Sequence, residues 1–210
     1  MKTAFGLARG TGFASLCGVA LALTGCVSLG GVEPPDSVFT LTSTATPPAG
    51  SGAATGGEDR AGAIAVLTPE VPAKLDVTRI PVNVSDTEIA YLQDAFWIER
   101  PARLFRRLMG ETLRSRAGDA VLVLDSDDTP ARASQSVRGT LLDLTYDAPS
   151  RSVVVRYEAI LSDDAGVVTS RRFEAREEGV SPEAAFVGPA LNRVANTVAE
   201  EVADWVLAGN

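Results

Sequence analysis

Residues 136–177 read SVRGTLLDLTYDAPSRSVVVRYEAILSDDAGVVTSRRFEARE, and this stretch decides the fold. It contains three runs rich in apolar and β-branched residues, 136–147, 152–162 and 167–177. The links between the runs, Asp-Ala-Pro-Ser and Asp-Asp-Ala-Gly, are typical of hairpin turns. In the middle run apolar residues alternate with Arg156 and Glu158, which indicates one buried face and one solvated face. The stretch therefore predicts an antiparallel meander.

Two amphipathic helices should flank the meander. Before it, Pro101 opens a helix that Gly118 closes, with apolar side chains on one face and arginines on the other. After it, Ser181 caps a helical region in which apolar residues repeat at helical spacing as far as Trp205. The dipeptide Gly188-Pro189 marks a kink or a restart in this second helix. We expect the second helix to lie across the sheet.

Shorter apolar runs should add strands to the sheet, and they span 38–41, 64–67, 89–96 and 121–124. Prolines follow the run at 64–67, as they would an edge or entry strand. The run at 121–124 should be a buried strand, and the run at 38–41 should join the main sheet. The sequence thus predicts an α+β fold with a mixed, mostly antiparallel sheet and two amphipathic helices packed on it.

Two segments near the N-terminus have compositions that disfavour a packed structure. Residues 26–37 are rich in Gly and Pro and should form a tether that reaches at most about 40 Å when stretched. Residues 44–62 are mostly Ala, Gly, Thr and Pro and should form a flexible loop. Because the few residues between these segments are too few for a domain, we expect one domain over 38–210.

The first 25 residues are expected to be a signal peptide. Lys2 and Arg9 precede an apolar run from Phe13 to Leu23, which is shorter than the roughly 20 residues that a membrane-spanning helix needs. The next residues complete Leu-Thr-Gly-Cys, which resembles the bacterial lipoprotein box. That resemblance implies cleavage before Cys26, acylation of Cys26 and a stable hold on the membrane. An ordinary secretory signal with an incidental cysteine is the alternative.

The residue after the cysteine bears on the destination of the protein. Position 27 is Val and not the Asp that resembles an inner-membrane retention signal. By that analogy, Val27 directs the lipid-anchored protein to the outer membrane, where the body would face the periplasm.

Composition excludes several kinds of chemistry. The chain has no histidine, and its two cysteines are Cys17, in the expected signal peptide, and Cys26. Cys/His zinc sites, cysteine nucleophiles and histidine-based serine triads are therefore excluded from the mature chain. No acidic pair has the spacing of an EF-hand, so we expect neither metal nor cofactor. The net charge of −8 disfavours nucleic acid as a partner.

Four short motifs lie along the body of the chain. They are Phe39-Thr40-Leu41, Leu75-Asp76-Val77-Thr78-Arg79-Ile80, Ile89-Ala90-Tyr91 and Phe96-Trp97-Ile98-Glu99-Arg100-Pro101. With the meander and the closing helix that contains Trp205, these motifs make the chain from residue 38 onward resemble the ABC-type transport auxiliary lipoproteins. These are the PqiC-like periplasmic partners of transport systems built on MCE proteins.

The resemblance implies an accessory part of a machine that moves phospholipid or another hydrophobic substrate across the envelope. Its partners would be the membrane, through lipidated Cys26, an MCE-domain protein, and an ABC permease and ATPase. Direct contact with lipid and homo-oligomer formation stay open. The protein itself lacks a phosphate-binding Gly-x-x-x-x-Gly-Lys loop, so we expect it to act by docking and not as an enzyme.

The segment from Leu75 to Arg100 is the candidate docking surface, because aromatic residues and arginines dominate protein interfaces. Alternatively, its aromatic residues belong to the core and its charged residues form local ion pairs in a solvated loop. A binding or assembly lipoprotein for another envelope machine, such as an activator of peptidoglycan synthesis, is the alternative function, and a lipid-anchored hydrolase is a weaker one. The candidate docking residues are Leu75, Asp76, Arg79, Tyr91, Trp97 and Glu99.

Overall fold

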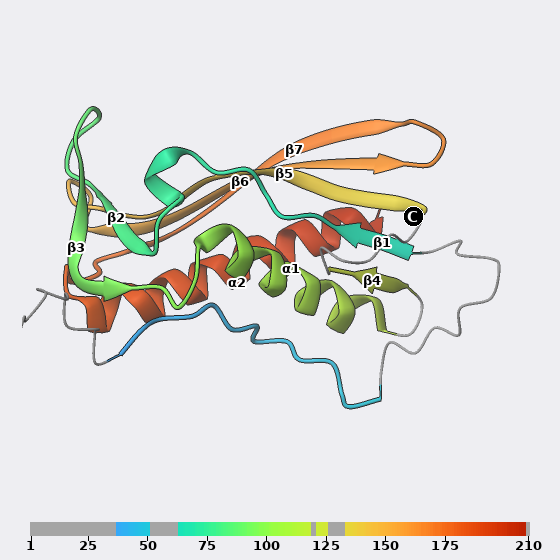
Figure 1. Ribbon diagram of the computed structural model, residues 1–210, viewed down its shortest axis with the longest axis horizontal. Helices are drawn as coiled ribbons and strands as arrows, with labels where there is room; N and C mark the ends of the chain where they lie inside the picture. The colour runs from blue at the N-terminus through green and yellow to red at the C-terminus, as the bar shows by residue number, and fades with distance from the viewer. Residues whose placement is uncertain (1–36, 51–62, 119–120, 126–132, 209–210) are drawn as a thin grey trace, which may run out of the picture. The chain divides into compact units, whose positions relative to one another are not determined.

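The computed structural model describes residues 37–50, 63–118, 121–125 and 133–208 (Figure 1). The chain divides into two units, Met1–Pro34 and Pro35–Asn210. All of the described residues belong to the second unit, which we call the body and consider by itself. The expected signal peptide, Cys26, Val27 and most of the expected loop at 44–62 lie outside the described residues.

The predicted meander forms one side of the sheet. Its strands are β5 (Gln135–Asp147), β6 (Ser152–Asp163) and β7 (Val168–Glu178), and each lies within one residue of its predicted bounds. β6 lies between the other two and pairs antiparallel with both. On one face of β6 Tyr157 is fully buried, whereas Arg156 on the other face is only half-buried. The alternation in the sequence therefore predicted both the pairing and the buried face.

Two further strand pairs lie on the other side of β5. β2 (Arg79–Asn83) runs parallel to the end of β5 and antiparallel to β3 (Ile89–Phe96). β1 (Ala63–Val66) runs parallel to the start of β5 and to β4 (Leu122–Leu124). β1 thus lies between two strands, so the expectation of an edge strand there is wrong, and β4 forms that edge.

Two helices pack on the sheet, as predicted. α1 (Pro101–Ala117) packs against α2 (Ala184–Ala208) and also contacts β1 and β4. α2 crosses β6 and β7, which confirms the expected placement, and Figure 1 shows both helices beneath β5, β6 and β7. α2 continues through Gly188 and Pro189 without a restart. The core therefore forms between one face of the sheet and the apolar faces of both helices.

The segment Val38–Thr44, which we call the strap, runs along the helices on the side away from the sheet (Figure 1). The Thr42 N–H donates to Asn192 Oδ1 and the Thr44 N–H donates to Asn196 Oδ1, both at 2.8 Å. Asn196 Nδ2 donates in return to the Thr42 carbonyl oxygen at 2.9 Å. Because the two asparagines are one turn apart on α2, they hold alternate residues of the strap, Thr42 and Thr44.

The start of the strap does not form the strand that we expected to join the main sheet. Phe39 makes only an isolated parallel bridge with Trp97, beyond the end of β3. Its ring lies against Gly188 of α2, where an added Cβ would come within 2.5 Å of the ring. The side chain of Phe39 is therefore locked between the end of β3 and the start of α2.

None of the helices in the described ranges is long and apolar enough to cross a membrane. Among the described residues, no group of three or more acidic side chains is placed to hold a metal ion.

Candidate docking surface

The six candidate docking residues fall into a buried pair and an exposed or half-buried set. Leu75 ends the short 3-10 helix η1 (Ala73–Leu75) and is 0% exposed, and Trp97, directly after β3, is 2% exposed. A partner cannot touch either side chain on the body as it is folded. Their burial restricts direct contact with a partner to the other four residues, Asp76, Arg79, Tyr91 and Glu99.

Trp97 joins the strap to the rest of the body. Its ring meets that of Phe39 edge-on, with centroids 6.3 Å apart and planes inclined at 71°. Its backbone N–H donates to the carbonyl oxygen of Thr78 at 2.7 Å. The indole Nε1 is buried and has no hydrogen-bond partner in the described part of the chain. Trp97 thus stabilises this end of the body through ring packing and its backbone bond.

Arg79 and Tyr91 form the aromatic part of the accessible set. They come from adjacent strands, β2 and β3, and the Arg79 Cζ lies 4.9 Å from the centroid of the Tyr91 ring. Stacking over an aromatic face orients the guanidinium group without using its N–H donors. The pair therefore presents a half-buried ring and an exposed arginine whose donors are not consumed by the stacking.

The acidic members of the set each pair with a different arginine. Asp76 Oδ1 lies 3.4 Å from Arg100 Nε, with both side chains more than half exposed, and Glu99 pairs with Arg107 of α1. Exposed pairs of this kind contribute about 0–1 kcal/mol to stability, so a partner can replace them at little cost. The structure thus places Asp76, Arg79 and Glu99 in separate pairs and not in one network.

A bulge in β3 shapes this surface. Tyr91 lies opposite Pro81, but the next paired residue on β3, Phe96, lies opposite Arg79, so β3 carries extra residues between these points. Within the extra stretch Asp94 has a φ of 51°, which is unusual outside glycine. Such bulges bend a strand, and Figure 1 shows β3 turning away from the sheet and running past the start of α2.

A second charged surface lies on the face of the meander away from the helices. Asp143 of β5, only 6% exposed, bonds Lys74 of η1 and Arg156 of β6, each at 2.5 Å. Arg156 also bonds Glu174 of β7 at 2.7 Å, and this hydrogen bond lowers the pKa of Glu174 and raises that of Arg156. The contact between Lys74 and Asp143 was not predicted, because the residues are far apart in the chain and no periodic pattern links them.

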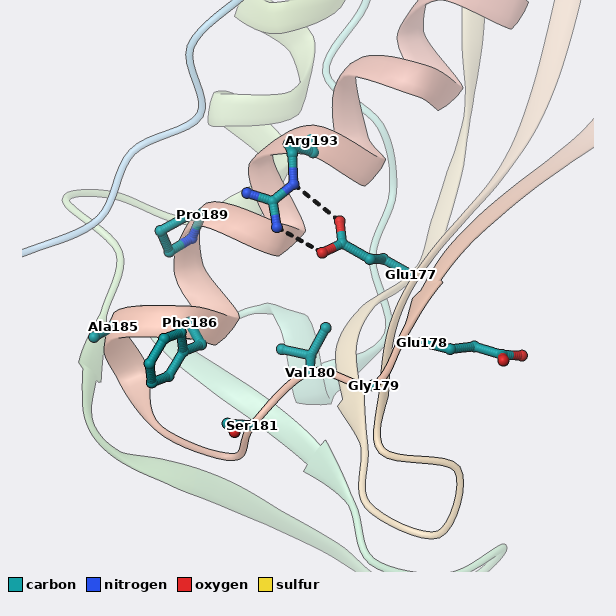
Figure 2. Close-up of a pocket in the computed structure, with 9 residues that line it drawn as sticks. All are labelled: Glu177, Glu178, Gly179, Val180, Ser181, Ala185, Phe186, Pro189 and Arg193. Atoms are coloured by element: carbon teal, nitrogen blue, oxygen red, sulfur yellow. Dashed lines mark hydrogen bonds and ion pairs between the residues drawn. The ribbon is translucent and has the colours of Figure 1, made fainter.

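A pocket of about 340 Å³ lies between the end of β7 and the first turns of α2 (Figure 2). Phe186 and Val180 supply apolar surface, and Glu177 bonds Arg193 through two hydrogen bonds of 2.6 and 3.0 Å. Because the charged pair satisfies itself, the pocket has no free acid and base side by side for proton transfer. The combination of apolar surface and a paired charge suits binding of a ligand at the surface.

The body, from the strap to the last turns of α2, matches a known family. Residues 39–203 match the family described as the ABC-type transport auxiliary lipoprotein component. The chain belongs to this family. The match begins at Phe39, so the strap is part of the auxiliary lipoprotein domain.

Solved structures share the fold of this auxiliary lipoprotein. XCC0632 from Xanthomonas campestris, of family DUF330, is 16% identical with a TM-score of 0.67, and the match covers 82% of this chain and 95% of that one. A crystal structure of an uncharacterized protein is 13% identical with a TM-score of 0.62, and it covers 81% of this chain and 99% of that one. A comparison with curated proteins gives no match. At these identities the likeness establishes the fold alone.

Proposed function

We propose that this auxiliary lipoprotein is anchored by acylated Cys26 in the outer membrane and serves, from the periplasmic side, an MCE-type ABC transport system that moves phospholipid or another hydrophobic substrate. The observation that carries the proposal is the family match over residues 39–203, which covers nearly the whole body. The lipoprotein box before Cys26 supports the anchor, and Val27 supports the outer membrane. The protein acts by docking and not by catalysis.

The docking surface in this proposal is the accessible set at the β2–β3 end of the body. Arg79 and Tyr91 are of the types that dominate interface energies, and their stacking fixes both side chains before a partner arrives. Asp76 and Glu99 flank them with charges that can exchange partners. This surface would meet the MCE-domain protein, which in turn meets the permease and ATPase.

Tyr91→Ala and Arg79→Glu should each reduce recovery of the MCE-domain and ABC proteins from cross-linked membranes by about tenfold or more, since a hot-spot residue contributes over about 1.4 kcal/mol. The melting temperature should stay near that of the parent, because neither side chain is buried in the core. The measurement is co-purification followed by mass spectrometry of proteins and bound lipid. Arg138→Glu, which makes the same charge change at an exposed position of β5, is the control.

Normal recovery with both variants would remove the docking role from this surface. Recovery of peptidoglycan synthases in place of MCE and ABC proteins would favour the alternative function, an assembly or activator lipoprotein.

Cys26→Ser should abolish labelling with fatty acid and release the protein from the outer-membrane fraction, because Cys26 is the one acylation site in the box. Val27→Asp should move the protein to the inner membrane if sorting follows the residue after the cysteine. Membrane fractionation with radiolabelled palmitate measures both effects. A Cys26→Ser protein that is still labelled and still in the outer membrane would contradict the lipoprotein interpretation.

A further inference from the structure

β7 is an open edge of the sheet. It pairs with β6 on one side, and the sheet has no strand on its other side in the described part of the chain. Of its residues, Phe173 alone is buried. A long edge strand with unpaired backbone groups is a ready template for another strand, and the side chains along it decide which strand can add.

The hydrogen-bond pattern shows which residues of β7 have free backbone groups. At the hairpin between β6 and β7, the Asp163 N–H donates to the Val167 carbonyl oxygen at 3.1 Å. In an antiparallel ladder hydrogen-bonded pairs alternate with non-hydrogen-bonded ones, and the β6–β7 register has no shift. The odd-numbered residues of β7 therefore direct N–H and C=O towards β6, and the even-numbered residues direct theirs away from the sheet.

The even-numbered residues also carry an ordered set of charges. Their side chains share the face of β7 opposite to Phe173, and their signs alternate along the strand. In order, they are Arg172, Glu174, Arg176 and Glu178.

We propose that β7 is a self-association edge, along which two copies of this chain pair antiparallel about Ala175. In this register Arg172 lies opposite Glu178 of the second copy, and Glu174 lies opposite Arg176 of the second copy. Every charge in the set then meets its opposite in a hydrogen-bonded pair. Such cross-strand pairs stabilise an antiparallel sheet, and like charges placed opposite destabilise it.

The neighbouring registers are disfavoured, some by the charges and some by the backbone. Sliding one strand by two residues in either direction keeps the backbone hydrogen bonds possible but places Glu opposite Glu and Arg opposite Arg. Sliding it by one residue places inward-directed backbone groups opposite outward-directed ones, so the ladder cannot form. A slide by four residues pairs only two of the four charged positions with opposite charges. The register about Ala175 is therefore favoured, because it alone pairs all four.

The contacts within one chain are compatible with this pairing. Arg172 contacts Glu158 and Glu174 contacts Arg156, both on β6. Glu174 also lies 3.6 Å from Arg176 of its own strand. A guanidinium group has five N–H donors and a carboxylate accepts several hydrogen bonds, so each group can add a partner in the second copy to those in its own chain.

The geometry also suits a lipid-anchored protein. Antiparallel pairing of identical edges places a two-fold axis normal to the sheet, so the helices of both copies lie on the same side. The strap lies on that side of each body (Figure 1). Both straps would thus lie on one side of the paired bodies, and the two β2–β3 surfaces would lie at the outer ends of a continuous sheet.

A cysteine at the two-fold axis tests the register directly. In the chain from residue 26 with Cys26→Ser, an added Ala175→Cys would be the only cysteine, and its Cα would lie about 4.5 Å from its copy, which a disulfide can span. Oxidation should give a covalent dimer on a non-reducing gel. Thr169→Cys on the same strand lies opposite a different residue and should stay monomeric on that gel. No cross-link at 175, or equal cross-linking at 169, would overturn the proposal.

Charge reversal gives a test without cysteine. Arg172→Glu or Glu178→Arg alone places like charges opposite each other, so sedimentation should show a mass falling from two chains to one. An equimolar mixture of the two variants should recover the dimer, because in a mixed pair positions 172 and 178 again carry opposite charges wherever they meet. Glu201→Arg, an exposed position on α2, should remain dimeric.

A monomeric parent chain, or a mixture that stays monomeric, would contradict self-association through β7. These readouts do not involve the transport partners and are independent of the proposed function.

Discussion

Trp97→Ala is expected to lower the free energy of unfolding of the body by about 3–5 kcal/mol, the usual cost of truncating a buried tryptophan. The side chain is 2% exposed and packs on Phe39, so its loss leaves a cavity between the end of β3 and the strap. The indole N–H has no hydrogen bond to lose within the described residues, and the effect therefore reports packing alone. Urea unfolding of the chain from residue 26, with Cys26→Ser, measures the change.

The neighbouring residue supplies the control for this experiment. Ile98 is 61% exposed, so Ile98→Ala should change stability by no more than about 0.5 kcal/mol. A loss below about 1 kcal/mol for Trp97→Ala, close to the scale of surface substitutions, would show that the ring is accessible. Trp97 would then again be a candidate for direct contact with a partner.

Gly139→Ala should have a still larger effect and prevent the body from reaching its native sheet. A Cβ on Gly139 of β5 would lie 1.9 Å from the carbonyl oxygen of Glu158 on β6. Because the clashing atom belongs to the backbone of the paired strand, no side-chain rotation relieves it, and the central pairing of the meander must open. We expect a loss above about 4 kcal/mol, at the extreme of single substitutions.

Gly166→Ala is the control that separates the effect of the steric clash at Gly139 from the effect of backbone strain. Gly166 has a φ of +84°, but an added Cβ there would meet nothing within 4 Å. This control should cost only about 1–2 kcal/mol, the penalty for a left-handed conformation. Circular dichroism and yield of folded protein compare the variants. A Gly139→Ala protein that unfolds like the parent would mean that β5 and β6 separate at this point without penalty.

The sequence predicted the parts of the fold that local patterns determine. The meander followed from alternation and turn residues, and both helices followed from apolar spacing and their end signals. β2 was missed because Pro81 lies at its centre and argues against an inner strand, yet Pro81 is tolerated beside the register shift with β3. The inner position of β1 depends on parallel pairing with β5, about 70 residues later, which no local pattern encodes.

The candidate surface was predictable only in part for a similar reason. The segment was identified from its motif, but composition does not distinguish a buried aromatic residue from an exposed one. Trp97 is buried because the strap, more than 50 residues earlier in the chain, returns to cover it through Phe39. Tyr91, only half-buried, instead stacks with Arg79.

The strap has a mechanical consequence for an anchored protein. In the proposed anchored protein, a pull along the strap loads the Asn192 and Asn196 hydrogen bonds together in shear. The Phe39 ring, seated against Gly188, resists the same sliding. Bonds loaded in parallel share a force that would break them one by one if the strap were peeled away. Phe39 also exchanges backbone hydrogen bonds with Phe96, the last residue of β3, and with Ile98. Tension on the strap is thus shared between the helical layer and the end of β3.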